Sequence, residues 1–131
     1  MLNLKKSEEW GGKVALDLKE AFTTFLYGER VKGALLLATA LLEQAQQPEM
    51  GEGGRRLYRL FLERVRQEAQ FAYEVTGHPK FREASARLKE VIWELHLGRA
   101  EEAACRLGEA ISLVTTALAQ PGARLQEEGL L

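Results

Sequence analysis

Few side chains in this sequence are suited to acid–base, nucleophilic or metal chemistry. The 131 residues include two histidines (His78 and His96), one cysteine (Cys105) and one aspartate (Asp17). This inventory excludes a Cys-rich zinc site and a multi-histidine metal site, and a single cysteine cannot form an internal disulfide. We therefore expect no bound metal and no cofactor.

His96 is the one candidate for acid–base chemistry, near the end of a predicted helix. Helical ribonucleases of the HEPN type place an arginine a short spacing before a histidine on one helix. Lys89 occupies that spacing here, and the nearest preceding arginine, Arg87, lies farther away, so the signature is incomplete. A histidine in a last turn also interacts favourably with the helix C-terminus, which explains His96 without catalysis. A helical ribonuclease centred on His96 is our third hypothesis.

Other catalytic patterns are absent from the sequence. Di-iron bundles need Glu-x-x-His on two helices, and no glutamate precedes either histidine at that spacing. Cys105 falls on an alanine-rich face, which predicts a small core residue and no nucleophile. The glycine-rich residues 51–54 lack the lysine and the preceding strand of a phosphate-binding loop. We predict no catalytic residue and no enzymatic activity.

Three arginines form one basic edge on a predicted helix, because Arg55, Arg59 and Arg66 project within a narrow angular range. Such an edge suits an anionic partner or a nucleic-acid backbone. The alternative is a solvated flank, with Glu63 reducing the local charge. The net charge of −1 argues against a generally cationic nucleic-acid binder. A nucleic-acid-associated protein using this edge is our second hypothesis.

The composition indicates a globular, helical protein of one domain, residues 1–131. The chain is 46% hydrophobic and 28% charged, and it is rich in the helix formers Leu, Ala, Glu and Arg. Many Glu and Arg residues with a single asparagine fit a heat-adapted organism. No signal-peptide pattern is present, and the longest apolar stretch, residues 34–42, is about half a membrane span. We expect a cytoplasmic protein without a membrane segment.

Hydrophobic periodicity predicts an all-α, five-helix antiparallel bundle built from helical hairpins. The predicted helices cover about residues 7–27, 30–47, 55–76, 80–97 and 99–119, with a loop at 48–54. The first helix begins between Ser7 and Lys13, because Gly11-Gly12 disfavours a helix interior. Gly28 is predicted to end the first helix, Gly98 to make a tight turn, and Pro121-Gly122 to end the fifth helix.

The apolar stripes predict which faces are buried. The second helix is apolar on nearly all sides, through Leu36, Leu37 and Ala40, which predicts a helix surrounded by neighbours. The predicted core positions of the last three helices are Tyr58, Phe61, Leu62, Val65, Ala69, Ala72, Phe81, Ala84, Leu88, Val91, Ile92, Leu95, Ala100, Ala103, Ala104, Leu107, Ala110, Ile111, Val114 and Leu118.

Two glycine turns suggest an internal repeat. Tyr27-Gly28 and Leu97-Gly98 each end one predicted helix and open the next, and small residues follow both at matching offsets. Duplication is one explanation. The other is convergence on small residues where helices pack closely.

Residues 98–113 resemble the second helix of a tetratricopeptide repeat. Gly98, Ala103, Leu107 and Ala110 match the family's turn glycine, alanine, large residue and second alanine. The preceding helix departs from the pattern, and the chain shows no regular repeat of that length. Separately, Leu26-Tyr27-Gly28 followed by Ala34 resembles a short segment of flagellar secretion chaperones. Both resemblances imply a small helical adaptor or chaperone-like protein without catalysis.

Exposed apolar residues give the strongest functional indication. Trp93 lies far from the centre of its helix's buried stripe, so a plain bundle leaves it in water. Trp10, Leu125 and Leu130 in the terminal regions are further interface candidates. The alternative is that the terminal segments fold over Trp93 within one chain. We predict a non-catalytic helical interaction module that forms a homodimer, with an unknown protein partner.

Overall fold

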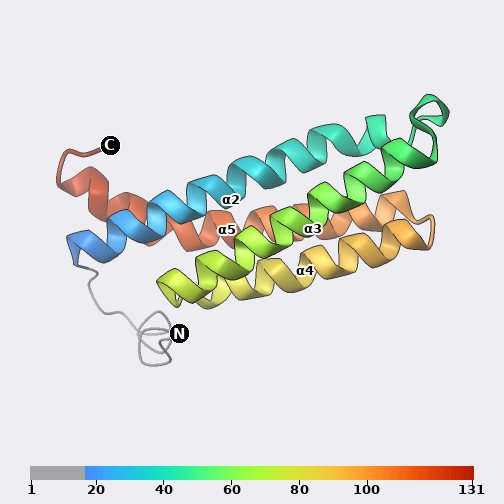
Figure 1. Cartoon of the computed structure of the whole chain (residues 1–131). Coiled ribbons are helices and arrows are strands. Elements are labelled where there is room, and N and C mark those ends of the chain that lie inside the picture. The colour runs from blue at the N-terminus through green and yellow to red at the C-terminus, as the bar shows by residue number, and fades with distance from the viewer. Residues whose placement is uncertain (1–16) are drawn as a thin grey trace.

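A computed structural model describes residues 17–131, which form an antiparallel bundle of four α-helices with no strand (Figure 1). The elements are α2 (Leu18–Ala45), the 3-10 turn η1 (Pro48–Met50), α3 (Gly51–Thr76), α4 (Pro79–His96) and α5 (Ala100–Glu127). Each helix packs against two others, in the cyclic order α2, α3, α4 and α5. The all-α prediction is confirmed, and the prediction of five helices is wrong for the described residues.

The predicted helix boundary at Gly28 is not present, because Gly28 lies in the interior of α2. It is buried, and a Cβ atom there would lie 2.5 Å from Leu118 Cδ2 and 3.2 Å from Phe81 Cζ. The glycine therefore permits close approach of α5 and α4. Only Gly98, with φ of 75°, makes the predicted turn. The proposed pair of one-glycine hairpins is therefore not present, and residues 7–16 of the predicted first helix lie outside the described residues.

Two further boundaries differ from prediction. The expected loop at residues 48–54 is only the short η1, because Gly51 adopts a φ of 63° and α3 begins there. At the other end, α5 continues through Pro121 to Glu127. Proline removes one helical hydrogen bond, but burial of Pro121 and Leu125 against the bundle outweighs that loss. Leu125, a predicted interface residue, is thus buried within the bundle.

The core runs along the bundle axis and contains most of the predicted stripe residues. Tyr58 of α3 is buried and its hydroxyl donates a hydrogen bond of 2.5 Å to the Ala38 carbonyl of α2. The expectation that neighbours surround residues 30–47 is wrong: Leu36 and Leu37 are exposed, because only α3 and α5 pack beside α2. Ala104 also faces solvent.

The turn between α3 and α4 lies where the sequence predicts it, between the predicted helices 55–76 and 80–97. Gly77 adopts a left-handed conformation with φ of 73° and caps α3. His78 precedes Pro79, and its Nδ1 accepts a hydrogen bond of 3.2 Å from the Lys80 backbone amide. No helix among the described residues is long and apolar enough to cross a membrane.

Candidate interaction surface around Trp93

Trp93 projects from the outer side of α4, where 59% of its surface is exposed. Its ring stacks on His96, one turn later, with centroids 5.6 Å apart and planes inclined by 28°. The C-terminal residues lie at the other end of the bundle from the α4–α5 turn (Figure 1), so they do not cover this ring. Trp10 lies outside the described residues. Trp93 lies between two surface hollows, which differ in their lining residues and in their charge.

The first hollow is a groove of about 1080 Å³ along α4 and α5. Its α5 side is lined by the small exposed residues Cys105, Gly108 and Ser112 and by the half-buried Arg106, Glu109 and Leu113. A Cβ atom at Gly108 would meet nothing within 4 Å, so no neighbour among the described residues requires glycine there. Cys105 is exposed, which contradicts the prediction of a small core residue. At 100° per residue Cys105 lies about 160° from both Ala103 and Leu107, on the opposite side of α5 from its buried stripe.

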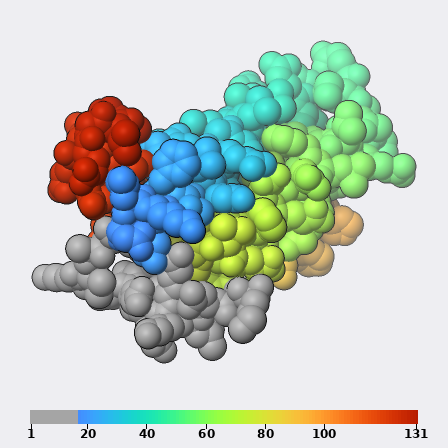
Figure 2. All heavy atoms as spheres, turned by 60° about the vertical axis from the view of Figure 1, so that its left-hand side comes forward, coloured from blue at the N-terminus to red at the C-terminus, as the bar shows by residue number. Residues whose placement is uncertain are grey.

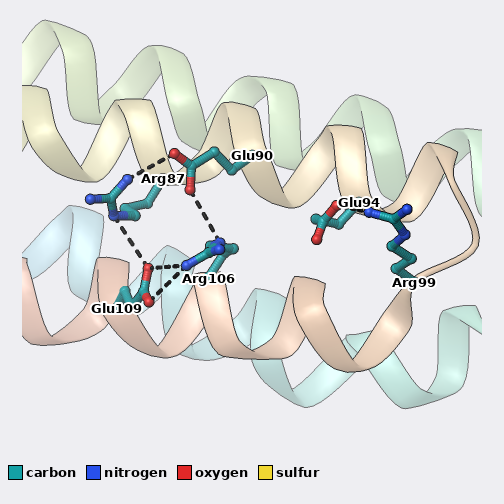
Figure 3. Close-up of polar contacts among 6 residues, drawn as sticks. All are labelled: Arg87, Glu90, Glu94, Arg99, Arg106 and Glu109. Atoms are coloured by element: carbon teal, nitrogen blue, oxygen red, sulfur yellow. Dashed lines mark hydrogen bonds and ion pairs between the residues drawn. The ribbon is translucent and has the colours of Figure 1, made fainter.

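A closed ring of four charged residues spans the middle of this groove (Figure 3). From α4, Arg87 contacts Glu90 at 2.8 Å and Glu109 of α5 at 3.3 Å. Arg106 of α5 contacts Glu109 at 3.0 Å and Glu90 at 3.2 Å. The hydrogen bond from Arg106 to Glu109 raises the pKa of this guanidinium above its ordinary value. The centre of the groove therefore carries two positive and two negative side chains, whose charges cancel.

The sequence contains a signal for this ring. Arg-x-x-Glu occurs at Arg87-Glu90 and again at Arg106-Glu109, at equal distances on the two sides of Gly98. In an antiparallel hairpin those positions face each other, so each arginine meets the glutamate of the other helix. Arg99 and Glu94 form a separate pair nearer the turn, 3.5 Å apart (Figure 3).

The second hollow, of about 490 Å³, lies between α3 and α4 on the other side of Trp93. Its cationic and potentially cationic lining residues are Arg56, Arg59, Lys89 and His96. Among the described residues, neither Arg56 nor Lys89 forms an ion pair. The hollow combines positive charge with an exposed aromatic ring.

The predicted arginine edge is only partly gathered here. Arg55 and Arg59 both pair with Glu52, at 3.6 and 3.3 Å, and Arg66 pairs with Glu63. Of the three predicted arginines, Arg59 alone lines the hollow beside Trp93. Glutamates one or two turns away thus offset much of the positive charge of the edge.

The two histidines occupy different environments. His96 lines the hollow between α3 and α4, whereas Arg87 lines the groove on the other side of Trp93. His96 shares its hollow with Arg56 and Arg59 of α3, and not with Arg87 of its own helix. His78 is buried at the start of α4, and burial, with a contribution from Lys80, lowers its pKa to about 4. It is held neutral as a helix cap.

The remaining predicted residues divide between core and surface. Leu130 is 58% exposed at the C-terminal end, while Leu125 is buried. Within residues 17–131, no group of three or more His, Cys, Asp or Glu side chains is arranged to hold a metal ion. Comparison with protein-family models, with curated proteins and with solved structures gave no match to this chain.

Proposed function

We propose that this protein is a non-catalytic interaction module of the cytoplasm that docks a partner polypeptide in the α4–α5 groove. The observation that carries the proposal is the exposed Trp93 beside a groove whose α5 side carries the small exposed residues Cys105, Gly108 and Ser112. A large aromatic side chain next to small residues that leave room for a partner suits the binding of a helix or an extended segment.

The electrostatics of the groove indicate the chemistry of this partner. Because Arg87, Glu90, Arg106 and Glu109 neutralise one another, the groove has no excess of either charge. A partner segment with an apolar residue for Trp93 and polar residues for the ring fits best. The resemblance of residues 98–113 to a tetratricopeptide helix supports a peptide-binding role.

Cys105 provides a direct test, because it is the only cysteine and lies exposed in the groove. The full chain labelled at Cys105 with a photoactivatable cross-linker is added to an extract of its source cells and irradiated. We expect a discrete adduct with one polypeptide, competed by excess unlabelled protein and strongly reduced by Trp93→Ala.

A matched control places the label elsewhere. In Cys105→Ser/Leu57→Cys the label lies at an exposed position of α3, away from the groove. That variant is expected to give no such adduct. Equal adducts from both positions, or adducts at Cys105 that ignore Trp93→Ala, would contradict partner docking in the groove.

The basic hollow between α3 and α4 favours a second candidate function, binding of single-stranded nucleic acid. Stacking of a base on Trp93 with phosphate contacts from Arg56 and Lys89 is the usual mode for such ligands. Fluorescence anisotropy with a labelled oligonucleotide tests it: binding should weaken steeply with salt and with Lys89→Glu. No binding at low salt would exclude this function.

The ribonuclease hypothesis has its own assay. RNA cleavage that is abolished by His96→Ala would establish it, and an uncleaved RNA substrate would exclude it. The protein-docking proposal predicts no cleavage by either the original chain or this variant.

A further inference from the structure

The outer face of α2 is apolar along most of its length, and no other helix of the described chain covers it. Phe22, Leu26, Leu36 and Leu37 are each between 49% and 56% exposed. Figure 1 shows α2 along one edge of the bundle, and Figure 2 shows its atoms at the surface. The helices on its two sides, α3 and α5, leave this face open.

Six exposed positions of α2 follow one another at alternating spacings of four and three residues, which is the pattern of a coiled-coil seam. We name these six positions the α2 seam: Phe22, Leu26, Glu29, Gly33, Leu36 and Ala40. All six are exposed. At 1.5 Å per residue the seam is about 27 Å long.

Gly33 is the most informative member of the seam. A Cβ atom there would meet nothing within 4 Å, so packing among residues 17–131 gives no reason for glycine. Inside a helix glycine costs about 1 kcal/mol relative to alanine. Gly28 of the same helix differs, because a Cβ atom there would clash with Leu118. Close approach of a group from outside the chain accounts for Gly33.

We propose that a second copy of this chain packs antiparallel on the α2 seam, with the two-fold axis at the level of Val31. In this register each large residue faces a smaller or equal one. Phe22 faces the partner's Ala40, and Leu26 faces the partner's Leu36. Gly33 leaves room for the aliphatic part of the partner's Glu29.

Charge also selects the antiparallel orientation. Lys32 lies beside the seam, on the side where Gly28 meets Leu118 of α5, and Glu29 is the seam residue one turn before it. Neither Glu29 nor Lys32 forms an ion pair among the described residues. In the antiparallel register Glu29 lies opposite the partner's Lys32, and symmetry repeats this pair. A parallel, in-register pair would instead place Glu29 against the partner's Glu29, which is repulsive.

The other flank of the seam accommodates the same arrangement. There the two copies bring their Arg30 side chains to the same level. Arg30 lies 3.6 Å from Glu68 and its guanidinium is 5.8 Å from the Tyr27 ring centroid in its own chain. These contacts hold the charge toward α3, away from the two-fold axis.

This dimer is independent of the proposed partner docking. Trp93 projects from α4, which lies diagonally opposite α2 in the bundle. Self-association through α2 therefore leaves both Trp93 grooves open, and a dimer carries two docking sites. The sequence-based expectation gave Trp93, Trp10, Leu125 and Leu130 as the interface candidates, whereas this proposal assigns the dimer contact to α2.

Sedimentation velocity of the full chain over a range of concentrations tests the inference. We expect a dimer for the original chain, and a monomer for Leu26→Glu, which buries a charge at the seam. Leu57→Glu is the matched control, because Leu57 is 68% exposed on α3 outside the seam. A chain that is monomeric at all concentrations overturns the proposal, as does a dimer that Trp93→Ala dissociates and Leu26→Glu leaves intact.

A charge exchange keeps the test independent of folding defects. Glu29→Lys alone and Lys32→Glu alone each create two repulsive pairs, and each is expected to weaken the homodimer about tenfold. Mixing the two variants restores two attractive pairs, so native mass spectrometry should show the heterodimer in excess of both homodimers. A statistical mixture of the three species would contradict the antiparallel register.

Discussion

Gly28 of α2 lies directly against Leu118 of α5, so closely that a Cβ atom at position 28 would fall 2.5 Å from Leu118 Cδ2. This contact sets how near the two helices approach at one end of the bundle. Phe81 of α4 closes the same point from the other side, with its Cζ 3.2 Å from that Cβ position. Three helices therefore converge on a position without a side chain, five residues before the exposed Gly33.

The two glycines of α2 are predicted to respond to alanine in opposite directions. Gly28→Ala forces Leu118 and Phe81 to move in a packed core, so we expect a loss of about 1–3 kcal/mol in unfolding free energy. Gly33→Ala meets open space and should stabilise the monomer by up to about 1 kcal/mol. Urea unfolding at concentrations where the chain is monomeric measures both. Equal effects of the two substitutions would contradict this contrast.

His78 is predicted to make stability depend on pH. Its pKa falls from 6.5 in the unfolded chain to about 4 in the fold, because burial disfavours the imidazolium. Above pH 6.5 His78 is neutral in both the folded and the unfolded chain, and the unfolding free energy has its full value. The unfolding free energy falls as pH decreases from 6.5 toward 4, because the unfolded chain binds the proton first. A shift of this size corresponds to roughly 3 kcal/mol at most.

The matched variant for this prediction is His78→Asn, which keeps an acceptor at the N-cap and cannot titrate. Chemical unfolding at several pH values is compared for the two proteins. The unfolding free energy of the original chain should fall relative to that of His78→Asn as pH falls through this window. A constant difference would mean that His78 is not held neutral by the fold.

The sequence predicted the helical class and the buried faces of α3, α4 and most of α5, because those stripes repeat at helical period. It did not predict the continuity of α2 and α5. Glycine and proline usually interrupt helices, and the contacts that override them come from distant residues. Gly28 meets Leu118, ninety positions later, and Pro121 is buried by the folded bundle.

The candidate site was predictable in part for a related reason. The exposure of Trp93 followed from its angle on one helix. The exposure of Cys105 also follows from its angle, opposite Ala103 and Leu107 on α5. Burial of Leu125 depended on where α5 ends. The ring formed by Arg87, Glu90, Arg106 and Glu109 required the register of an antiparallel hairpin, which the spacing around Gly98 contains.

The ion-pair ring is predicted to contribute modestly and to depend on salt. Glu109 contacts two arginines, Arg87 and Arg106, but the side chains of all three are about 40% exposed. Glu109→Gln is therefore expected to lower the unfolding free energy by about 0.5–1 kcal/mol at low salt and by less at high salt. Glu83→Gln is the control, because among residues 17–131 Glu83 forms an ion pair only with Lys80, at 3.5 Å. A loss that does not change with salt would contradict an electrostatic origin.

Trp93 is predicted to be dispensable for folding. Its side chain is 59% exposed, so Trp93→Ala removes little buried apolar surface and should change the unfolding free energy by less than about 0.5 kcal/mol. Phe81→Ala, at a fully buried position of the same helix, should cost about 3–5 kcal/mol. Thermal unfolding of the two variants measures this contrast. A folded Trp93→Ala protein that no longer cross-links through Cys105 would assign the side chain to partner binding, whereas a destabilisation close to that of Phe81→Ala would assign it to the fold.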